Sequence, residues 1–411
     1  MRQSQLFTKT KKEAPADEVS KNAKLLIRAG FINKEMAGVY SYLPLGLRVL
    51  KKVENIIRKE MDNVGGQEIL MSSFQPKENW EKTGRWNSMD DLYKVSDSSK
   101  REVALGPTHE EIVVPILRNY ASSYKDFPVA VYQIQNKFRM ELRAKSGILR
   151  GREFIMKDMY SFHTSQKDFE NFYEKMKDVY KSIFQRVGIG DMTYMTFASG
   201  GTFSKYSHEF QTVTPAGEDT IYIDKEKNIA INKEVFNDEV LESLGLKKEK
   251  LIESHSIEVG NIFDLKTKYS EPFDLSFTDE KGQKHTILMG CYGIGLSRLI
   301  GTVVEALADD KGIIWPESIS PFQIHLVSLC TDEADIKKVD NLYERLKLQG
   351  KEVLYDDRIG VRPGEKFADS DLIGMPTRYI ISPKTLANES VEIKKRTESE
   401  AKIISIDELL K

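Results

Sequence analysis

The order of helix-type and strand-type segments constrains the fold of this chain more than any other feature of its sequence. Apolar residues recur every three or four positions over 44–64 and again over 166–187, which predicts two long amphipathic helices. Short runs typical of strands surround these helices, for example 67–74, 129–135, 153–156 and 285–289. Strands outnumber the helices that could cross between parallel strands, so we expect an α+β fold with a mainly antiparallel sheet.

The residues that follow Pro321 have a different pattern and predict a separate domain. Ile319-Ser320-Pro321 has the composition of a hinge. Beyond it, strand and helix patterns alternate at 324–329, 336–348, 353–355, 366–373 and 379–381. Such alternation is typical of a small α/β domain built from βαβ units. We therefore expect a first domain at 1–319 and a second at 320–411.

Composition excludes several classes of protein. The chain has 61 Lys and Arg against 63 Asp and Glu, and this balance excludes a uniformly basic nucleic-acid coat. No apolar run approaches the roughly 20 residues of a membrane helix, and the N-terminus lacks the apolar core of a secretory signal. The two cysteines, Cys291 and Cys330, are too few for a disulfide framework. We expect a cytoplasmic protein with no membrane partner.

The segment 137–157 is the most unusual stretch, with seven basic residues against Glu141 and Glu153. Its flanks have strand patterns, and Gly147 and Gly151 bracket a turn, so a strand–loop–strand hairpin is expected. Guanidinium groups on both strands would bind phosphate oxygens in a bidentate manner. A solvated charged hairpin is an equally good interpretation of the charge alone.

Two shorter segments are candidates for binding. In GCYGIGLSR, Arg298 stands where a dinucleotide fingerprint has its third glycine, so we expect a close strand-to-helix junction that directs Arg298 into a cleft. In GPTHEE, Thr108 and Glu110 could bind an ammonium group, although this pattern is more often an ordinary turn or helix cap.

Together these segments resemble a known family. Phe138–Glu141 (FRxE), Arg150-x-x-x-Phe154 and the GIGLSR that ends at Arg298 resemble motifs 2 and 3 of the class II aminoacyl-tRNA synthetases, and the helix led by Pro44 resembles motif 1. Among these enzymes the chain resembles the bacterial-type prolyl-tRNA synthetases, in LGPTHEE, YQIQNKFR, REFIMKDMYSFH, SHEFQ, EVGNIFDLKTKYS and MGCYGIGLSR. The later DDR…RPGEKFADSDLIGMP resembles their anticodon-binding domain.

This resemblance implies a class II catalytic domain that attaches L-proline to tRNA(Pro) through a prolyl-adenylate, using ATP and Mg²⁺. It also implies a homodimer in which the motif 1 helices meet, with the stripe from Leu47 to Val64 as a candidate contact. The resemblance assigns residues as follows: catalysis to Arg139 and Arg298; proline binding to Thr108, Glu110, Arg139, Phe162 and His208; ATP binding to Arg139, Glu141, Arg150, Phe154, Gln211 and Arg298; anticodon binding to Arg358, Arg362, Glu365 and Asp369; and Mg²⁺, as a guess, to Glu209. Cys291 is expected in the motif 3 turn, near the site but not as a nucleophile.

The chain departs from the family between motifs 2 and 3. Longer bacterial members carry an editing domain there that removes wrongly attached alanine, whereas this chain has only residues 220–257. We expect no editing domain, and we expect Leu241, Leu244 and Leu246 to pack one short helix against the catalytic sheet. Two alternatives remain: a catalytically inactive synthetase-like protein that binds RNA or regulates, and a class II synthetase for another amino acid.

Overall fold

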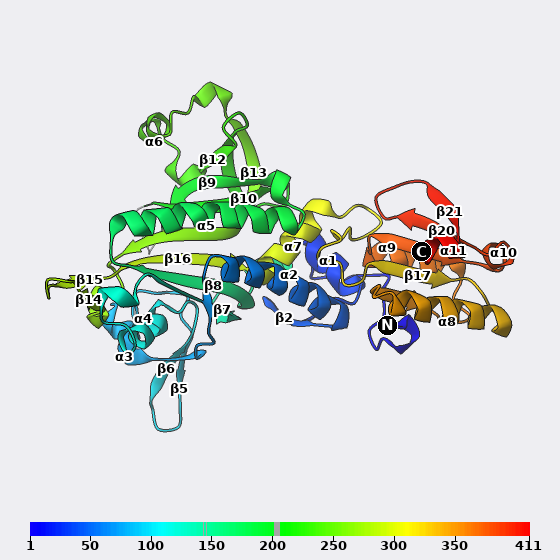
Figure 1. Ribbon diagram of the computed structural model, residues 1–411, viewed down its shortest axis with the longest axis horizontal. Helices are drawn as coiled ribbons and strands as arrows, with labels where there is room; N and C mark the ends of the chain where they lie inside the picture. The colour runs from blue at the N-terminus through cyan, green and yellow to red at the C-terminus, as the bar shows by residue number, and fades with distance from the viewer. Residues whose placement is uncertain (143, 145, 201–205) are drawn as a thin grey trace. The chain divides into compact units, whose positions relative to one another are not determined.

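The computed structural model describes residues 1–142, 144, 146–200 and 206–411. These residues form two units (Figure 1). The first comprises Met1–Glu35, Tyr40–Lys52 and Val303–Lys411, and the second comprises Met36–Val39 and Val53–Thr302. Among the described residues, no helix combines the length and the apolar character needed to cross a membrane.

A nine-stranded sheet is the centre of the second unit, in the order β10-β9-β12-β11-β13-β16-β8-β7-β3. Its pairings are antiparallel apart from β12 with β9 and β3 with β7. The strands are β3 (Gln67–Glu68), β7 (Val129–Phe138), β8 (Glu153–His163), β9 (Thr193–Ser199), β10 (Tyr206–Val213), β11 (Asp219–Asp224), β12 (Ile229–Asn232), β13 (Ile252–Lys266) and β16 (Leu288–Gly295). The mainly antiparallel sheet expected from the sequence is confirmed.

The two predicted long helices are present as α2 (Pro44–Asn63) and α5 (Gln166–Arg186). The side chain of Ser165 accepts a hydrogen bond from the Asp168 amide and caps α5. Helix α5 lies along the sheet in Figure 1 and buries one apolar face. Five further helices are α1 (Lys21–Arg28), α3 (Lys77–Lys82), α4 (Glu110–Arg118), α6 (Asp238–Ser243) and α7 (Leu296–Leu307).

The predicted strands at 129–135 and 153–156 are longer than expected, because β7 ends at Phe138 and β8 at His163, and the other two predicted strands are each divided. The run 67–74 is not one strand, because β3 ends at Glu68 and β4 (Phe74–Pro76) pairs instead in a small sheet with β6 (Glu102–Leu105) and β5 (Lys94–Ser96). The run 285–289 is divided between β15 (Lys284–Thr286), which pairs with β14 (Ser276–Thr278), and β16. Cys291 lies inside β16, not in a turn.

The segment between motifs 2 and 3 is part of the sheet. It supplies β12, most of β11 and the beginning of β13. Helix α6 buries Val240 and Leu241, which share a small apolar cluster with Ile231 of β12 and with Leu246, and Leu244 is partly buried against the same cluster. A short helix packs here as predicted, but α6 ends at Ser243, so only Leu241 of the three leucines lies in it and the other two pack from the turn that follows.

The C-terminal part of the first unit contains a five-stranded sheet in the order β18-β17-β19-β20-β21. Its predicted alternation is confirmed by β17 (Ile324–Ser328), α8 (Glu333–Leu348), β18 (Val353–Asp356), α9 (Pro363–Ile373) and β19 (Thr377–Ile381). The sequence analysis missed α10 (Pro383–Ala387), β20 (Ser390–Lys395), β21 (Ala401–Ser405) and α11 (Ile406–Leu409). The same unit also contains α1 and most of a hairpin formed by β1 (Ile32–Met36) and β2 (Val39–Tyr42). Only Met36 of β1 and Val39 of β2 belong to the second unit.

Candidate active site

The basic segment forms the predicted hairpin, with β7 and β8 as its two antiparallel strands. Pairing of Lys137 with Phe154 fixes the register, and the Arg139 amide donates to the Arg152 carbonyl at 2.9 Å just beyond the ladder. Two of the seven basic positions, 143 and 145, lie outside the described residues. The hairpin therefore carries Arg139 and Phe154 side by side at the end where its loop connects the two strands.

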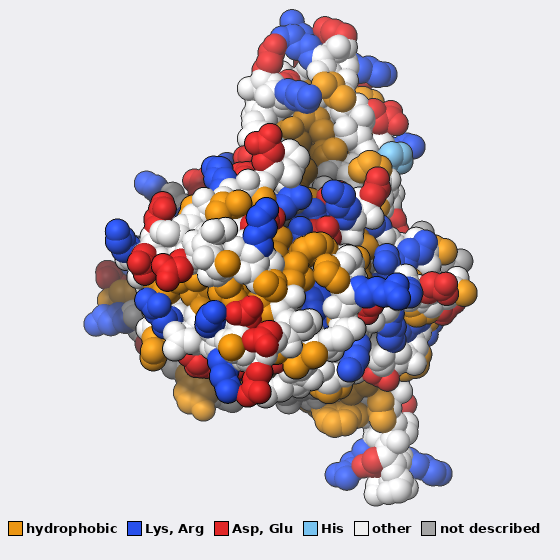
Figure 2. Space-filling view, turned by 90° about the vertical axis from the view of Figure 1, so that its right-hand side faces the viewer, with side chains coloured by type: hydrophobic (Ala, Val, Ile, Leu, Met, Phe, Trp, Pro, Cys, Tyr) orange, Lys and Arg blue, Asp and Glu red, His pale blue; other side chains and the backbone are white. Residues whose placement is uncertain are grey.

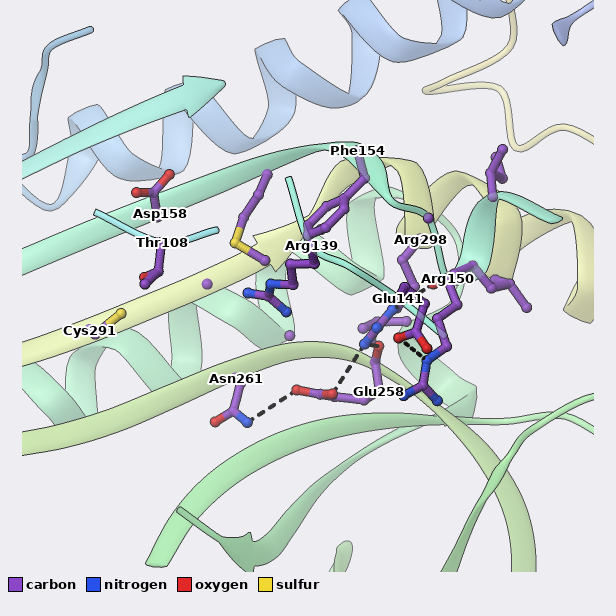
Figure 3. A pocket seen from close by; sticks show the side chains of 18 of the residues that line it. Thr108, Arg139, Glu141, Arg150, Phe154, Asp158, Glu258, Asn261, Cys291 and Arg298 are labelled. Atoms are coloured by element: carbon purple, nitrogen blue, oxygen red, sulfur yellow. Dashed lines mark hydrogen bonds and ion pairs between the residues drawn. The ribbon is translucent and has the colours of Figure 1, made fainter. Parts of the chain in front are cut away.

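This hairpin, with β13, β16 and the turn before α4, encloses a cavity of about 180 Å³. Figure 3 shows Thr108, Asp158 and Cys291 at one end, Arg139 and Phe154 in the middle, and Glu141, Arg150, Glu258 and Arg298 at the other end. Three segments that are distant in the sequence, around residues 108, 139–154 and 291–298, thus meet in one place.

One end of the cavity carries a buried carboxylate with two donors. Glu110 is fully buried, and its Oε2 accepts a hydrogen bond of 2.6 Å from Thr108 Oγ1. The Cys291 thiol lies 3.5 Å from the other carboxylate oxygen. Burial and the negative charge of Glu110 raise the pKa of Cys291, so this thiol is protonated and is not a nucleophile.

Arg139 occupies the middle of the cavity with few contacts of its own. Its Nη2 donates to the Pro107 carbonyl at 3.2 Å, and its guanidinium lies 5.2 Å from the centroid of the Phe154 ring. Its buried Nε has no hydrogen-bond partner among the described residues. Burial lowers the pKa of Arg139, and the positive charge of Arg298 acts in the same direction. A cation in such surroundings is a strong site for an anion.

Two more arginines lie at the far end. Arg150 pairs with Glu141 at 2.5 Å and with Glu218 at 3.0 Å. Arg298 donates from Nε to the Leu149 carbonyl and from Nη1 to both the carbonyl and the side chain of Glu258. Both guanidinium groups remain about a third exposed, so their other N–H groups face solvent-accessible space.

The glycine run before Arg298 keeps the cavity open. A Cβ added at Gly293 would meet only Met156 Sδ, at 3.9 Å, so a side chain there would project into the cavity. Behind the adjacent strand, a Cβ at Gly260 would lie 2.9 Å from the Tyr180 ring. Gly293 thus leaves open space in the cavity, and Gly260 allows β13 to pack closely against Tyr180 of α5. The junction of β16 with α7 directs Arg298 into the cavity, as the sequence predicts.

Four residues assigned to the site do not reach the cavity. Phe162 is fully buried in an apolar cluster below α4. His208 lies on β10 between the rings of Tyr173 and Phe197, and burial lowers its pKa to about 4. Gln211 is fully buried and donates to Glu209 and Asp219. Glu209, the fourth, lies two residues before it on the same strand.

The guess that Glu209 binds Mg²⁺ does not fit its surroundings. Its two carboxylate oxygens already accept hydrogen bonds from the side-chain amides of Gln211, Asn232 and Asn261. Burial and the charge of Glu258 raise its pKa to about 8. In the part of the chain that the structure describes, no group of three or more His, Cys, Asp or Glu side chains could hold a metal ion.

The four residues assigned to the anticodon differ in their surroundings. Arg358 is occupied within its own domain, because its guanidinium pairs with Asp356 at 2.7 Å and with Asp369 at 2.9 Å. Asp369 is buried. Arg362 and Glu365, by contrast, are exposed at the start of α9. Only this second pair is open to a partner.

Several cavity residues were not assigned from the sequence. Glu258, Asn261 and Asp158 line it, and Glu218 holds Arg150. Glu258 and Asn261 lie in the EVGNIF segment, and Asp158 lies in REFIMKD. Both segments carry the family resemblance, so the sequence contained a signal that could have identified these three residues. Glu218 had no such signal, since it follows an ordinary Pro-Ala-Gly turn.

Comparisons with known proteins place the chain in a family. A family model described as the tRNA synthetase class II core domain (G, H, P, S and T) matches residues 93–307, and an anticodon-binding domain model matches residues 319–411. Proline–tRNA ligase of a Wolbachia strain is 40% identical over 427 residues, which cover 100% of this chain and 99% of that protein. The ligase of Caulobacter vibrioides is 39% identical over 436 residues (100% and 98%), and that of a Geobacillus strain is 35% identical over 562 residues (100% and 98%).

Solved structures with the same fold include two prolyl-tRNA synthetases. That of Cryptosporidium parvum, complexed with L-proline and AMP, has a TM-score of 0.77 at 19% identity and is matched over 95% of this chain and 73% of its own. That of Giardia lamblia, in complex with prolyl-adenylate, has a TM-score of 0.78 at 18% identity, with 94% and 75% covered.

Proposed function

The chain belongs to the family of the proline–tRNA ligases, and on that premise we propose how its own residues bind proline, ATP and tRNA. It is a class II synthetase that attaches L-proline to tRNA(Pro) with ATP through a prolyl-adenylate. The assignment of residues depends above all on one observation. Arg139, which is half-buried and whose Nε has no hydrogen-bond partner among the described residues, lies between the Thr108–Glu110 pair and the two arginines Arg150 and Arg298.

The reaction requires two anions to be brought together. A proline carboxylate attacks the α-phosphate of ATP, and this displacement needs neither an enzymic nucleophile nor much proton transfer. The site must align the two anions and neutralise the charge that builds between them. In this proposal Arg139 binds the carboxylate and the α-phosphate together, because a guanidinium fork can contact both at once.

The Thr108–Glu110 end suits the ring nitrogen of proline. That secondary ammonium has two N–H donors, and the Thr108 hydroxyl and the Glu110 carboxylate supply two acceptors on one turn. Thr108 Oγ1 gives its own hydrogen to Glu110, which leaves its lone pairs available to the substrate. The fully buried carboxylate would compensate the positive charge of proline.

The opposite end suits ATP. Phe154, whose ring already lies beside the Arg139 guanidinium, would stack on adenine. Arg150, oriented by Glu141 and Glu218, and Arg298, oriented by Glu258, would contact the nucleotide and its phosphates. We propose that Mg²⁺ accompanies the ATP phosphates, with no residue of this chain assigned as its ligand.

A pyrophosphate-exchange assay tests this function. Exchange of labelled pyrophosphate into ATP should be much faster with proline than with any other amino acid. Lack of proline-dependent exchange would favour the inactive, RNA-binding alternative, and exchange with another amino acid would favour a different specificity. We propose a cytoplasmic location, which is consistent with the two buried, unpaired cysteines.

We propose that residues 320–411 recognise the tRNA anticodon, with Arg362 and Glu365 as the contact residues. In this proposal Arg358 does not contact the tRNA but stabilises the domain through its ion pairs with Asp356 and Asp369. Basic and acidic side chains are interspersed on the face shown in Figure 2. Recognition by hydrogen bonding and stacking of splayed anticodon bases suits such a surface better than a broad positive charge.

We propose a homodimer, with a different contact from the one first expected. Most of the α2 stripe is buried within the chain, and Leu47 is its one markedly exposed leucine. Leu70, between β3 and β4, and Phe74, the first residue of β4, are 76% and 62% exposed and would suit an interface. Light scattering should give twice the 47.0 kDa of one chain. Leu70→Asp should reduce that mass, whereas Leu348→Asp, at a similarly exposed leucine of α8, should not.

We propose that the enzyme does not hydrolyse alanyl-tRNA(Pro). The Geobacillus alignment spans 562 positions, so some 150 of them have no counterpart in this chain of 411. Residues 220–257 are occupied in building β11, β12, α6 and part of β13. Purified enzyme given pre-formed alanyl-tRNA(Pro) should release alanine at the uncatalysed rate. Clearly faster release would reveal a hydrolytic site elsewhere in the chain.

A further inference from the structure

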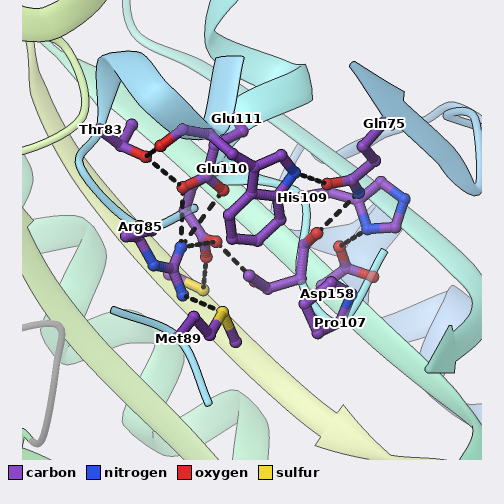
Figure 4. A network of polar contacts seen from close by, with 12 residues as sticks. Gln75, Thr83, Arg85, Met89, Pro107, His109, Glu110, Glu111 and Asp158 are labelled. Atoms are coloured by element: carbon purple, nitrogen blue, oxygen red, sulfur yellow. Dashed lines mark hydrogen bonds and ion pairs between the residues drawn. The ribbon is translucent and has the colours of Figure 1, made fainter. Parts of the chain in front are cut away.

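A second carboxylate lies directly beside the one that faces the cavity. Glu110 and Glu111 are consecutive at the start of α4, and both are fully buried. Figure 4 shows the guanidinium of Arg85 placed against the two of them. Two buried negative charges on adjacent residues are costly unless a cation compensates them.

Arg85 is shared unequally between the two glutamates. Its Nη1 lies 2.9 and 3.2 Å from the two oxygens of Glu111 but 3.5 Å from Glu110 Oε2. Thr83 Oγ1 donates to Glu111 at 2.9 Å and completes that pair. Glu110 lines the cavity and Glu111 does not. The geometry therefore neutralises the carboxylate that faces away from the cavity.

Arg85 itself is held rigidly. It is 7% exposed, lies 5.1 Å from the centroid of the Trp80 ring and 5.5 Å from that of Tyr269, and donates to Met89 Sδ at 3.4 Å. Burial raises the pKa of Glu111 to about 7, with Arg85 acting in the opposite direction and Glu110 adding to the rise. Arg85 thus favours the ionised state of Glu111.

We propose that Arg85 is a positioning residue that compensates Glu111 and so reserves the negative charge of Glu110 for the ring ammonium of proline. This inference rests on the proposed role of Glu110. On this inference the affinity for proline depends on the charges of Arg85 and Glu111, neither of which contacts the substrate. Without Glu111, Arg85 would pair with Glu110 and oppose the incoming ammonium.

A double-variant cycle tests this balance, with the Michaelis constant for proline in the exchange assay as the readout. Glu111→Gln should raise that constant at least about tenfold and leave the constant for ATP unchanged, since one buried charge interaction is redirected. Adding Arg85→Met should restore the constant to within about threefold of wild type. The double variant lacks both Glu111 and its cation, so the carboxylate of Glu110 is again available to the ammonium of proline. Glu78→Gln, at an exposed glutamate of α3, is the matched control.

A purely structural role predicts the opposite order, with the double variant at least as impaired as Glu111→Gln, and that result would overturn the inference. Wild-type affinity of Glu111→Gln would overturn it as well. If Glu111→Gln does not fold, the double variant, whose net charge equals that of the wild type, tests the inference by itself. It should still bind proline in preference to tetrahydrofuran-2-carboxylate, which lacks the ammonium, and loss of that preference would refute the proposal. Absence of proline-dependent exchange in the wild type would instead refute the proposed function.

Discussion

Replacing Arg139 by alanine is expected to reduce proline-dependent pyrophosphate exchange by about a hundredfold or more. The substitution removes the cation that lies between the two substrate ends, and loss of one preorganised charge donor costs about 3 kcal/mol or more in the transition state. Among the described residues, the Arg139 side chain has one hydrogen bond, to Pro107, and a ring contact with Phe154. The variant should therefore fold and melt much like the wild type.

The Arg139 experiment has two comparison variants. Arg139→Lys should recover only part of the exchange rate, because an ammonium cannot contact the carboxylate and the phosphate in a bidentate manner. Arg101→Ala removes an arginine that is 81% exposed and should change nothing. A folded Arg139→Ala enzyme that exchanged pyrophosphate at a near wild-type rate would show that the site is wrongly assigned.

The parts of the fold that sequence patterns predicted are those with local causes. The apolar spacing and the Ser165 cap define α5, and the paired strands of the basic hairpin bring Arg139 and Phe154 together. Bounds were less predictable where tertiary pairing decides them. Between Glu68 and Phe74 the chain leaves one sheet and joins another, and no local pattern marks that change.

The assigned residues that lie outside the cavity do so for geometric reasons. Phe162 lies on the same strand as Phe154 and Asp158 and at the same parity, so its side chain is on the same side of the sheet. Four residues beyond Asp158, however, correspond to about 13 Å along a strand, and there the cavity has been replaced by the apolar cluster under α4. A motif match gives the strand and the side, but not where the cavity ends.

The charged residues illustrate a second limit. Arg358 stands two positions after Asp356, and its guanidinium pairs with that carboxylate instead of a partner's. Arg85 and Glu111 are separated by 26 positions, and no sequence pattern connects them. Short-range ion pairs and long-range ones look alike in a sequence, so which charges are already compensated is known only from the fold.

Replacing Glu110 by glutamine is expected to raise the Michaelis constant for proline by about a hundredfold and to leave that for ATP nearly unchanged. Truncating one partner of a buried charge pair costs about 2–5 kcal/mol, since the other charge is left uncompensated. The glutamine is isosteric and can still accept the hydrogen bond from Thr108, so the turn before α4 should keep its conformation. The loss would then measure the missing charge.

Two comparisons separate this effect from a general one. Glu249→Gln changes an exposed glutamate far along the sequence and should leave both constants as they are. Adding Arg85→Met to Glu110→Gln should not restore affinity, because the carboxylate that contacts the ammonium is itself gone. The contrast with the rescue expected for Glu111→Gln is the sharpest consequence of the arrangement. Two adjacent, fully buried glutamates differ in role because Glu110 faces the cavity, whereas Glu111 faces away from it and lies closer to Arg85. A Glu110→Gln enzyme with wild-type affinity for proline would contradict both assignments at once.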